Sequence, residues 1–390
     1  MHQPEGLPIE ITSSTNSGDI SIISSQGPGI ESSDRAAQFV ALASRISRPA
    51  DNLSTSVVAF SWGSLHFPVS VNDGAASTCY VCCPSTAYID YALAELRNLR
   101  GSFFKASLGL LIKGLGRLLI RLSRLDRQVQ VNNWLFATNV IPQIEAEALP
   151  ELTQSLCRLY VDSNVIWRSL NTYSDGEKIR AFKKSGYRLL PARQIYMFDC
   201  RQRNQPVSRD ERRDAKLGYD NKYDMIAGDD IQTGEFVRIA SLYRKLYIDK
   251  YTPLNPQYTP DFLEGLHRAR IVEFYGLRSK DGQLDGVIGF FCVGDTMTAP
   301  IVGYDTALPA ADGLYRRLMS IGMQLARERR LLLNLSAGAA SFKRNRKALP
   351  AIEYMAVYNR HLGLRPRAAA FVVESILSGI GLPLLRRFEL

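Results

Sequence analysis

The sequence lacks the features that mark secreted, metal-binding or membrane-spanning chains. Six cysteines among 390 residues show no disulfide spacing, and the Cys79, Cys82 and Cys83 cluster is followed by no second ligand pair at zinc spacing. Four scattered histidines form no cluster, and the first residues lack the basic and apolar regions of a signal peptide. No uninterrupted apolar run reaches the ~18–20 residues of a spanning helix. We therefore expect reduced thiols and a cytoplasmic protein.

Acidic residues are also scarce relative to basic ones. Lys and Arg total 48 against 38 Asp and Glu, a formal net charge of +10. The 46% hydrophobic and 22% charged residues are ordinary for a globular chain. An excess of positive charge points towards anionic partners, namely nucleic acid, an acidic carrier protein, a phosphorylated cofactor or an anionic membrane surface.

The chain is long enough for two domains of ordinary size. Residues 1–54 are rich in Ser, Thr, Gly and Pro, and we expect a flexible extension in which ITSST and ISIISS could add edge strands. We predict a first domain over residues 55–200 and a second over residues 234–390. The charged residues 201–233 between them are expected to connect the two.

Apolar and polar periodicity predicts alternating strands and helices in both halves, hence a mixed α/β sheet. In the first half, strands are expected at 56–72, 78–83, 131–138, 165–170 and 194–199, with helices at 88–127 (broken near Gly101), 142–160 and 175–185. In the second half, strands are expected at 270–278, 286–294, 299–304, 331–335 and 352–358, with helices at 235–251 and 313–330. A last helical segment from about 367 is expected to break near Gly379, Gly381 and Pro383.

One predicted helix, within residues 105–125, carries charge of a single sign. Lys113, Arg117, Arg121 and Arg124 follow each other at helical spacing, and no acid lies between Leu96 and Leu125. Such a helix could dock on a membrane surface or on an acidic partner. The alternative is a surface helix whose leucines pack on the sheet.

A second basic stretch, residues 331–354, combines a short apolar strand, a small-residue turn and a cationic helix. Gly338 lets the backbone approach a ligand closely, and Asn334 and Ser336 are expected to line one strand face. Lys343 and Arg346 lie three apart on one helical face and are candidate phosphate ligands. The alternative is a helix whose cations only face water.

The two halves repeat a short signature. AFKKSGY at 181–187 and SFKRNRK at 341–347 each follow a predicted strand and precede another. The shared Phe-Lys pair and the matching order of elements indicate a duplicated domain.

The order strand, hairpin, strand, long helix, strand, short helix, strand resembles the GNAT acyltransferase fold. Two such units, over roughly residues 55–386, resemble the double-GNAT proteins, which include Fem-type aminoacyltransferases and CelD-like acyltransferases. Their C-terminal halves carry a glycine followed by Tyr/Phe-Lys, similar to Gly338 and Phe342-Lys343 here. The expected fold class is therefore α/β with two tandem GNAT-like domains, the second holding the active cleft.

Two departures from the family pattern bear on the donor. The family's Arg/Gln-x-x-Gly-x-Gly/Ala loop, which holds the coenzyme A pyrophosphate, is replaced by DTALPAADGLYRRL with arginines only at Arg316 and Arg317. The family's helix-four tyrosine is replaced by Phe182 and Phe342. A donor on a carrier protein's phosphopantetheine arm, or on tRNA, suits these changes better than acetyl-CoA.

The resemblance implies direct attack of a neutral amine on the donor carbonyl. Backbone N–H groups near Val302 and Gly303 would stabilise the oxyanion. Tyr304 and Asp305, where a predicted strand ends, are candidates for proton transfer, with Glu353 and Tyr354 as second candidates. Tyr304 and Asp305 could instead only cap the strand end.

The predicted function is N-acyl transfer from a thioester donor, acyl-CoA or acyl carrier protein, to a small-molecule or peptide amine, with no tightly bound cofactor. Arg316 and Arg317 would help to hold the donor. Aminoacyl transfer from tRNA is the nearest alternative, and a non-catalytic nucleic-acid or membrane adaptor is a third.

Overall fold

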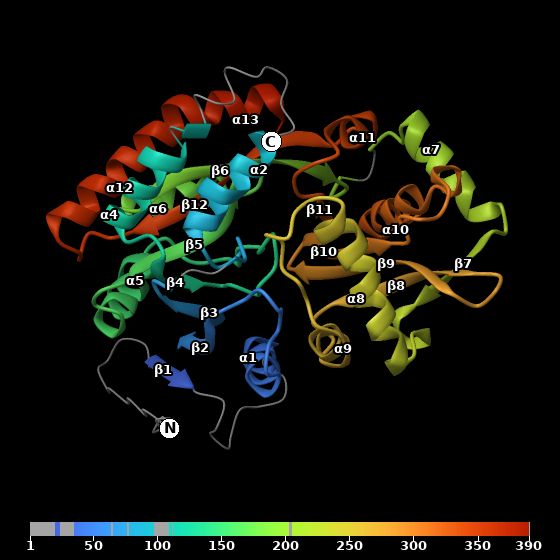
Figure 1. The fold of residues 1–390 in the computed structure, drawn as a ribbon, viewed down its shortest axis with the longest axis horizontal. Helices are drawn as coiled ribbons and strands as arrows, with labels where there is room; N and C mark the ends of the chain where they lie inside the picture. Colours follow the sequence, from blue (N-terminus) through green and yellow to red (C-terminus); the bar gives the residue numbers. More distant parts are fainter. Residues whose placement is uncertain are drawn as a thin grey trace.

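One mixed sheet runs through both halves of the chain. The computed structural model describes residues 20–23, 35–63, 65–75, 78–96, 109–110, 112–202 and 205–389. The sheet of these residues has twelve strands in the order β1-β2-β3-β4-β5-β12-β6-β11-β10-β9-β8-β7, with the N-terminal half on the left of Figure 1. The strands are β1 Ile20–Ile23, β2 Ser56–Trp62, β3 Leu65–Asp73, β4 Arg127–Val131, β5 Asn164–Asn171, β6 Arg188–Asp199, β7 Tyr223–Ala227, β8 Glu273–Ser279, β9 Leu284–Val293, β10 Thr296–Tyr304, β11 Leu332–Asn334 and β12 Leu349–Tyr358.

The two halves exchange their last strands. β6 ends the N-terminal repeat yet pairs with β11 of the C-terminal repeat, and β12 ends the C-terminal repeat yet pairs with β5. β6 and β12 pair antiparallel with each other at the centre. Each half keeps one parallel pair, β4 with β5 and β10 with β11. The halves therefore share backbone hydrogen bonds and cannot separate as independent sheets.

In the N-terminal half, helices cover both faces of the sheet. α5 (Ala148–Leu159) and α6 (Gly176–Lys184) pack on one core around Trp167 and Phe67. On the opposite core, around Ile120, Ile166 and Val373, lie the helical turns η1 (Thr86–Asp90), α2 (Tyr91–Leu96) and η2 (Ile112–Gly116), with α4 (Arg117–Ser123) and α12 (Leu364–Ile376).

In the C-terminal half, α10 (Leu314–Arg329) covers one face of β9, β10 and β11. The other face carries α1 (Arg35–Arg45), α8 (Phe236–Arg244) continued by the π-turn η6 (Lys245–Asp249), and α9 (Pro260–Arg268). α7 (Arg209–Lys216) precedes β7, and the short α11 (Ala340–Asn345) joins β11 to β12. The element order from β8 to β12 is the predicted one, so the prediction of tandem GNAT-like units in a mixed α/β fold is confirmed.

Several predicted elements differ from those observed. Residues 78–83 form a largely buried turn rather than a strand. The prediction was wrong because a short apolar run is equally compatible with a strand and with a buried loop. The strand expected at 131–138 is β4, which ends at Val131. Within the expected extension, β1 adds an edge strand and α1 packs Phe39 into the core. The expected connection contains α7 and β7. The break at Gly101 lies outside the described residues, and the domain boundaries stay predictions.

The C-terminal helix does not break where expected. α12 continues through the π-turn η8 (Leu377–Gly381) into α13 (Leu382–Phe388), with Pro383 in the first turn of α13. A π-turn lets the chain accommodate a proline that would clash inside a regular helix. The 25-residue helix Leu364–Phe388 is long and apolar enough to cross a membrane by length and composition, although Arg365, Glu374 and other polar residues interrupt its apolar run.

Candidate functional site

The two parallel strands of the C-terminal half separate after three paired residues. β10 pairs with β11 only over residues 296–298, and a bulge at 299–300 then turns it away. Beyond the bulge, residues 301–304 pair with β9, and no strand of the described chain pairs with their other edge. Val302 and Gly303, the predicted oxyanion donors, lie on this segment. Gly303 is required there, because a Cβ would lie 2.5 Å from the backbone nitrogen of Tyr243 in α8.

On the other side of the opening, the chain leaves β11 through a tight turn. Asn334 is buried, and its Oδ1 accepts a hydrogen bond of 2.8 Å from the N–H of Ser336. Ser336 (φ 59°), Gly338 (φ 75°) and Ala339 (φ 48°) are left-handed, which is costly for the two residues other than glycine. Such strain persists where the surroundings fix the backbone, and here it brings α11 back towards the opening.

Lys343 of α11 contacts the turn that follows β11. Its Nζ donates to the carbonyls of Ser336 (3.0 Å) and Ala337 (2.7 Å) and lies 5.5 Å from the Tyr196 ring centroid. The side chain is buried. Burial, and next the nearby Arg193, lower the pKa of the ammonium well below its ordinary value. The sequence predicted a phosphate ligand here, and that role stays a prediction. The lowered pKa favours loss of the proton, although two carbonyl acceptors and a ring face can also accommodate the ammonium.

Aromatic side chains line the region next to Lys343. Tyr304, at the end of β10, lies 6.3 Å from Tyr315 of α10, and Tyr315 lies 5.0 Å from Phe342 of α11, centroid to centroid. Burial raises the pKa of Tyr247 in η6, and the nearby Tyr315 raises it further. These rings pack against the same core cluster, so one aromatic wall extends from β10 to α11. The hydroxyl of Tyr304 lies 3.4 Å from Lys250.

A buried ion pair crosses the centre of the sheet beside the opening. Arg193 of β6 donates to both oxygens of Glu353 in β12, at 2.9 and 3.2 Å. Burial alone would lower the pKa of Arg193, but the pairing with Glu353 outweighs it and raises the pKa. Arg193 also donates to the hydroxyl of Thr138, which donates in turn to Ser336. The ion pair favours a structural role for Glu353, and its predicted catalytic role stays a prediction.

Tyr354 lies away from the opening, packed against the N-terminal core around Trp167 and Phe182.

Asp305, another predicted proton carrier, accepts hydrogen bonds from Lys245 (2.6 Å) and Arg238 (2.9 Å). Although burial acts to raise the pKa of Asp305, these bonds and the Ala307 N–H lower it to about 2. So acidic a carboxyl is a weak base at neutral pH, and the pairs tie α8 and η6 to β10.

The arginines predicted to hold a donor phosphate pair with α7 or with the residues just after it. Asp214 of α7 accepts hydrogen bonds of 2.6 Å from Arg316 and from Arg346. Arg317 donates to the Leu217 carbonyl and pairs with Asp220, just beyond α7. Asp214 is buried, so no bulk water separates these partners. The segment after residue 205 thus occupies the start of α10, where the family resemblance implies a pyrophosphate.

The corresponding opening of the N-terminal half is filled by its own chain. After β4 ends, Trp134 donates to Asn132 at 2.8 Å and Asn133 donates to Ser70 at 2.7 Å, all of them buried. Trp167 of β5 and Phe182 of α6 meet edge to face at 5.6 Å between centroids. Acids lie at the start of α5, Glu145 and Glu147 just before it and Glu151 in its first turn, and their charge disfavours a phosphate at that helix end.

Sequence reasoning missed three features of this region. Arg193 could have been noticed as a lone cation inside an apolar strand. Asp214 and Tyr247 gave no signal, because their partners lie far away in the sequence.

The strand order defines a fold of two tandem GNAT-like units, and Lys343 and Tyr304 lie near the point where β10 and β11 end. No protein-family model and no curated protein matches the chain. Solved structures similar to it include L-PGS from Bacillus licheniformis (14% identity, TM-score 0.43, 58% of this chain and 78% of that one). FemX is similar at 9% identity (TM-score 0.44, 56% and 78%). A tandem GNAT protein from the clavulanic acid biosynthesis pathway is similar at 9% identity (TM-score 0.40, 87% and 98%). The architecture stated above rests on the chain's own strand order.

Proposed function

We propose that this chain transfers an acyl or aminoacyl group to an amine in the opening between β10 and β11. The observation that supports this most directly is Lys343, a buried amine that contacts the turn where the chain leaves β11. Lys343 forms no ion pair with a carboxylate among the described residues, and a buried cation without one is costly to maintain. That cost favours a functional reason for its presence.

The chemistry follows from the hydrogen bonds of Lys343. A neutral lysine has two N–H groups and one lone pair, and the carbonyls of Ser336 and Ala337 accept both N–H groups. The lone pair can then take a proton from the attacking amine. The C–N bond forms, the C–S or C–O bond of the donor breaks, and Lys343 returns the proton to the departing sulfur or oxygen. The unpaired edge of residues 301–304 can supply N–H groups to the oxyanion.

The paired arginines bear on the choice of donor. Arg316 and Arg346 already bind Asp214, so a free coenzyme A would have to displace α7 to reach them. A thioester on an acyl carrier protein needs no diphosphate site at α10, and we propose it as the donor. Aminoacyl-tRNA is the second candidate, because it equally needs no such site and the net charge of +10 suits its phosphates.

The test is to incubate the protein with three donors of one acyl or aminoacyl group, acyl-CoA, acyl carrier protein and charged tRNA, and a mixture of primary amines. Mass spectrometry then detects the amide. Product from a carrier or tRNA donor, lost in Lys343→Met, supports the proposal. Product undiminished in Lys343→Met would overturn the role proposed for Lys343. No amide from any donor, together with intact nucleic-acid or membrane binding, would favour the adaptor alternative instead.

A further inference from the structure

A second surface, outside the strand opening, combines exposed apolar side chains with arginines. It is formed by η2, α4 and the C-terminal helix α12–α13, and Figure 1 shows α4 and α12 side by side. Leu115 and Leu118 are 41% and 53% exposed, so the prediction that this leucine face packs on the sheet is wrong for both. Leu119 does pack against the core, as predicted, beside the buried Ile120 and Ser123. Residues 97–108, the first part of the predicted cationic stretch, lie outside the description.

The C-terminal helix contributes most of the apolar area. In its most apolar 18-residue window, only 17% of the residues are buried. A soluble core helix as apolar as this one would be largely buried. The inner side packs Ala370 and Val373 on the sheet. Its large outward side chains are Leu364, Phe371, Val372, Ile380 and Phe388.

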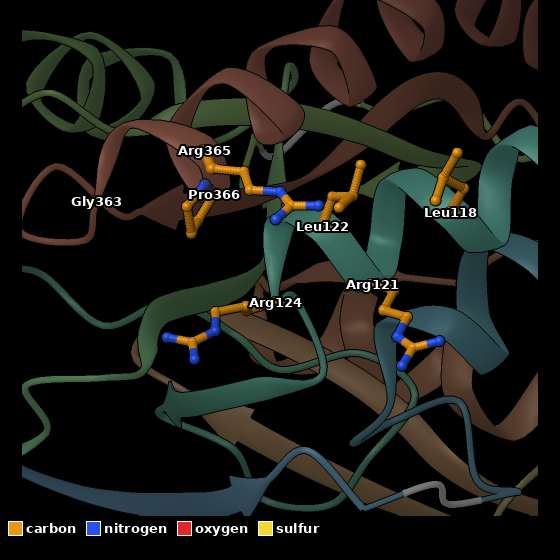
Figure 2. A pocket seen from close by; sticks show the side chains of 7 residues that line it. All are labelled: Leu118, Arg121, Leu122, Arg124, Gly363, Arg365 and Pro366. Atoms are coloured by element: carbon orange, nitrogen blue, oxygen red, sulfur yellow. The ribbon is translucent and has the colours of Figure 1, made fainter.

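Arginines border this apolar area, and most of them form no ion pair with an acidic residue of the described chain. Arg121, Arg124 and Arg365 line a groove of about 610 Å³ between α4 and α12, which Figure 2 shows together with Leu118, Leu122 and Pro366. These three arginines make no ion pair among the described residues. Arg386 and Arg387 lie exposed at the other end of the helix. The single acid of α12–α13, Glu374, is bound by Arg188 at 2.9 Å.

We propose that this face docks on the surface of an anionic phospholipid bilayer, with the apolar side chains at acyl-chain depth and the arginine groove on lipid phosphates. An exposed apolar helix flanked by arginines has the charge and polarity of an interfacial helix. An acidic protein would complement the arginines but would leave Leu364, Phe371 and Ile380 without an apolar counterpart. The helix lies flat because its inner side is held by the sheet.

The docked face also ends beside the strand opening. Glu389, just after α13, forms an ion pair with Arg344 of α11, the helix that carries Lys343. Docking would therefore place the opening near the membrane surface. The inference does not depend on the proposed transfer, since binding is measured without any donor.

The test is co-flotation of the full chain with vesicles of phosphatidylcholine alone, or with 30% phosphatidylglycerol. We expect binding to the anionic vesicles that weakens with salt. Arg121→Gln with Arg365→Gln should weaken binding about 30-fold, since each arginine near an anionic surface contributes roughly fivefold. The matched control is Arg45→Gln with Arg48→Gln. Both arginines are exposed, Arg45 as the last residue of α1 and Arg48 three residues after it, and this variant should bind as the unaltered chain does.

A second pair, Phe371→Ser with Val372→Ser, should weaken binding at every salt concentration, with the unfolding midpoint reported alongside. Absence of binding to anionic vesicles would overturn the proposal. So would an equal loss in the Arg45 and Arg48 control. Membrane association that resists alkaline carbonate would also overturn it, by showing that Leu364–Phe388 spans the bilayer rather than lying on it.

Discussion

Phe182 and Lys343 occupy equivalent positions in the two halves. Each helix ends in a Schellman motif, and these two residues supply the carbonyl that accepts its longer hydrogen bond. The Tyr187 N–H donates to the Phe182 carbonyl, and the Ala348 N–H donates to the Lys343 carbonyl. Each is also the buried residue of its helix, α6 or α11. The Phe-Lys repeat seen in the sequence is therefore offset by one residue in space. In one half an aromatic ring fills the core, and in the other an amine binds the turn that follows β11.

The first prediction concerns this pair. Lys343→Met should lower the transfer rate by at least about 10²-fold, in the range found for removal of a general base. The measurement is single-turnover amide formation at saturating donor. Lys183→Met is the matched control, because Lys183 is the aligned lysine of the sequence repeat but lies exposed on α6. It should leave the rate within about twofold, and a comparable loss in both variants would contradict the assignment.

The pH dependence of the reaction should report the same amine. Because the pKa of Lys343 is lowered, its neutral form accumulates as pH rises, and the rate should rise and level off well below pH 10.5. The measurement is the transfer rate at saturating donor across pH 6–10. Loss of the rising limb in Lys343→Met, with the limb retained in Lys183→Met, is the expected outcome. A limb that survives in Lys343→Met would assign it to another group.

Asp305 should matter to stability more than to rate. Its folded pKa of about 2 lies below the ordinary 3.8, so its ion pairs stabilise the fold above pH 4, by about 2 kcal/mol, and this is lost as pH falls towards 2. Asp305→Asn should lower the free energy of unfolding in urea at pH 7 by about that amount. The transfer rate of the folded variant should change only a few-fold. A loss of rate near that of Lys343→Met would restore the catalytic role predicted from the sequence.

Breaking the pair between Arg193 and Glu353 should destabilise the sheet centre. Glu353→Gln leaves a buried guanidinium without its counter-charge, which typically costs 3–5 kcal/mol. Urea unfolding measures this. The double variant Arg193→Met with Glu353→Gln should recover much of the loss, since no charge is then left unpaired. If the single variant keeps full stability but loses transfer, Glu353 acts in the chemistry.

Free coenzyme A should not stabilise the protein, because Asp214 holds Arg316 and Arg346. A ligand at 100 times its dissociation constant adds about 2.7 kcal/mol, which is visible as a higher unfolding midpoint. We expect no such shift in thermal unfolding with coenzyme A, and a shift with a phosphopantetheinylated carrier protein or charged tRNA. A shift with coenzyme A would show that α7 moves aside.

Local patterns predicted much of the C-terminal half. The SKDGQ hairpin, the helix at 313–330 and the strand at 331–335 were all visible, because turn chemistry and periodicity act over a few residues. The exchange of β6 and β12 could not be predicted from the sequence. Their paired residues lie about 160 positions apart, and no local pattern records such a pairing. Lys343 was selected from its sequence context, but its burial and its two carbonyl partners depend on the left-handed turn at Ser336 and Ala339. Asp214, which pairs with Arg316 and Arg346, lies in a segment that read as a connection.

The central claim is that the C-terminal opening forms amides and that Lys343 moves the proton. Its most direct test is single-turnover transfer from acyl carrier protein, and from charged tRNA, by the unaltered chain, Lys343→Met and Lys183→Met. The account predicts amide from at least one of these donors, a loss of about 10²-fold or more in Lys343→Met, and no loss in Lys183→Met. Equal rates in all three proteins, or amide formation lost only in Lys183→Met, would contradict it.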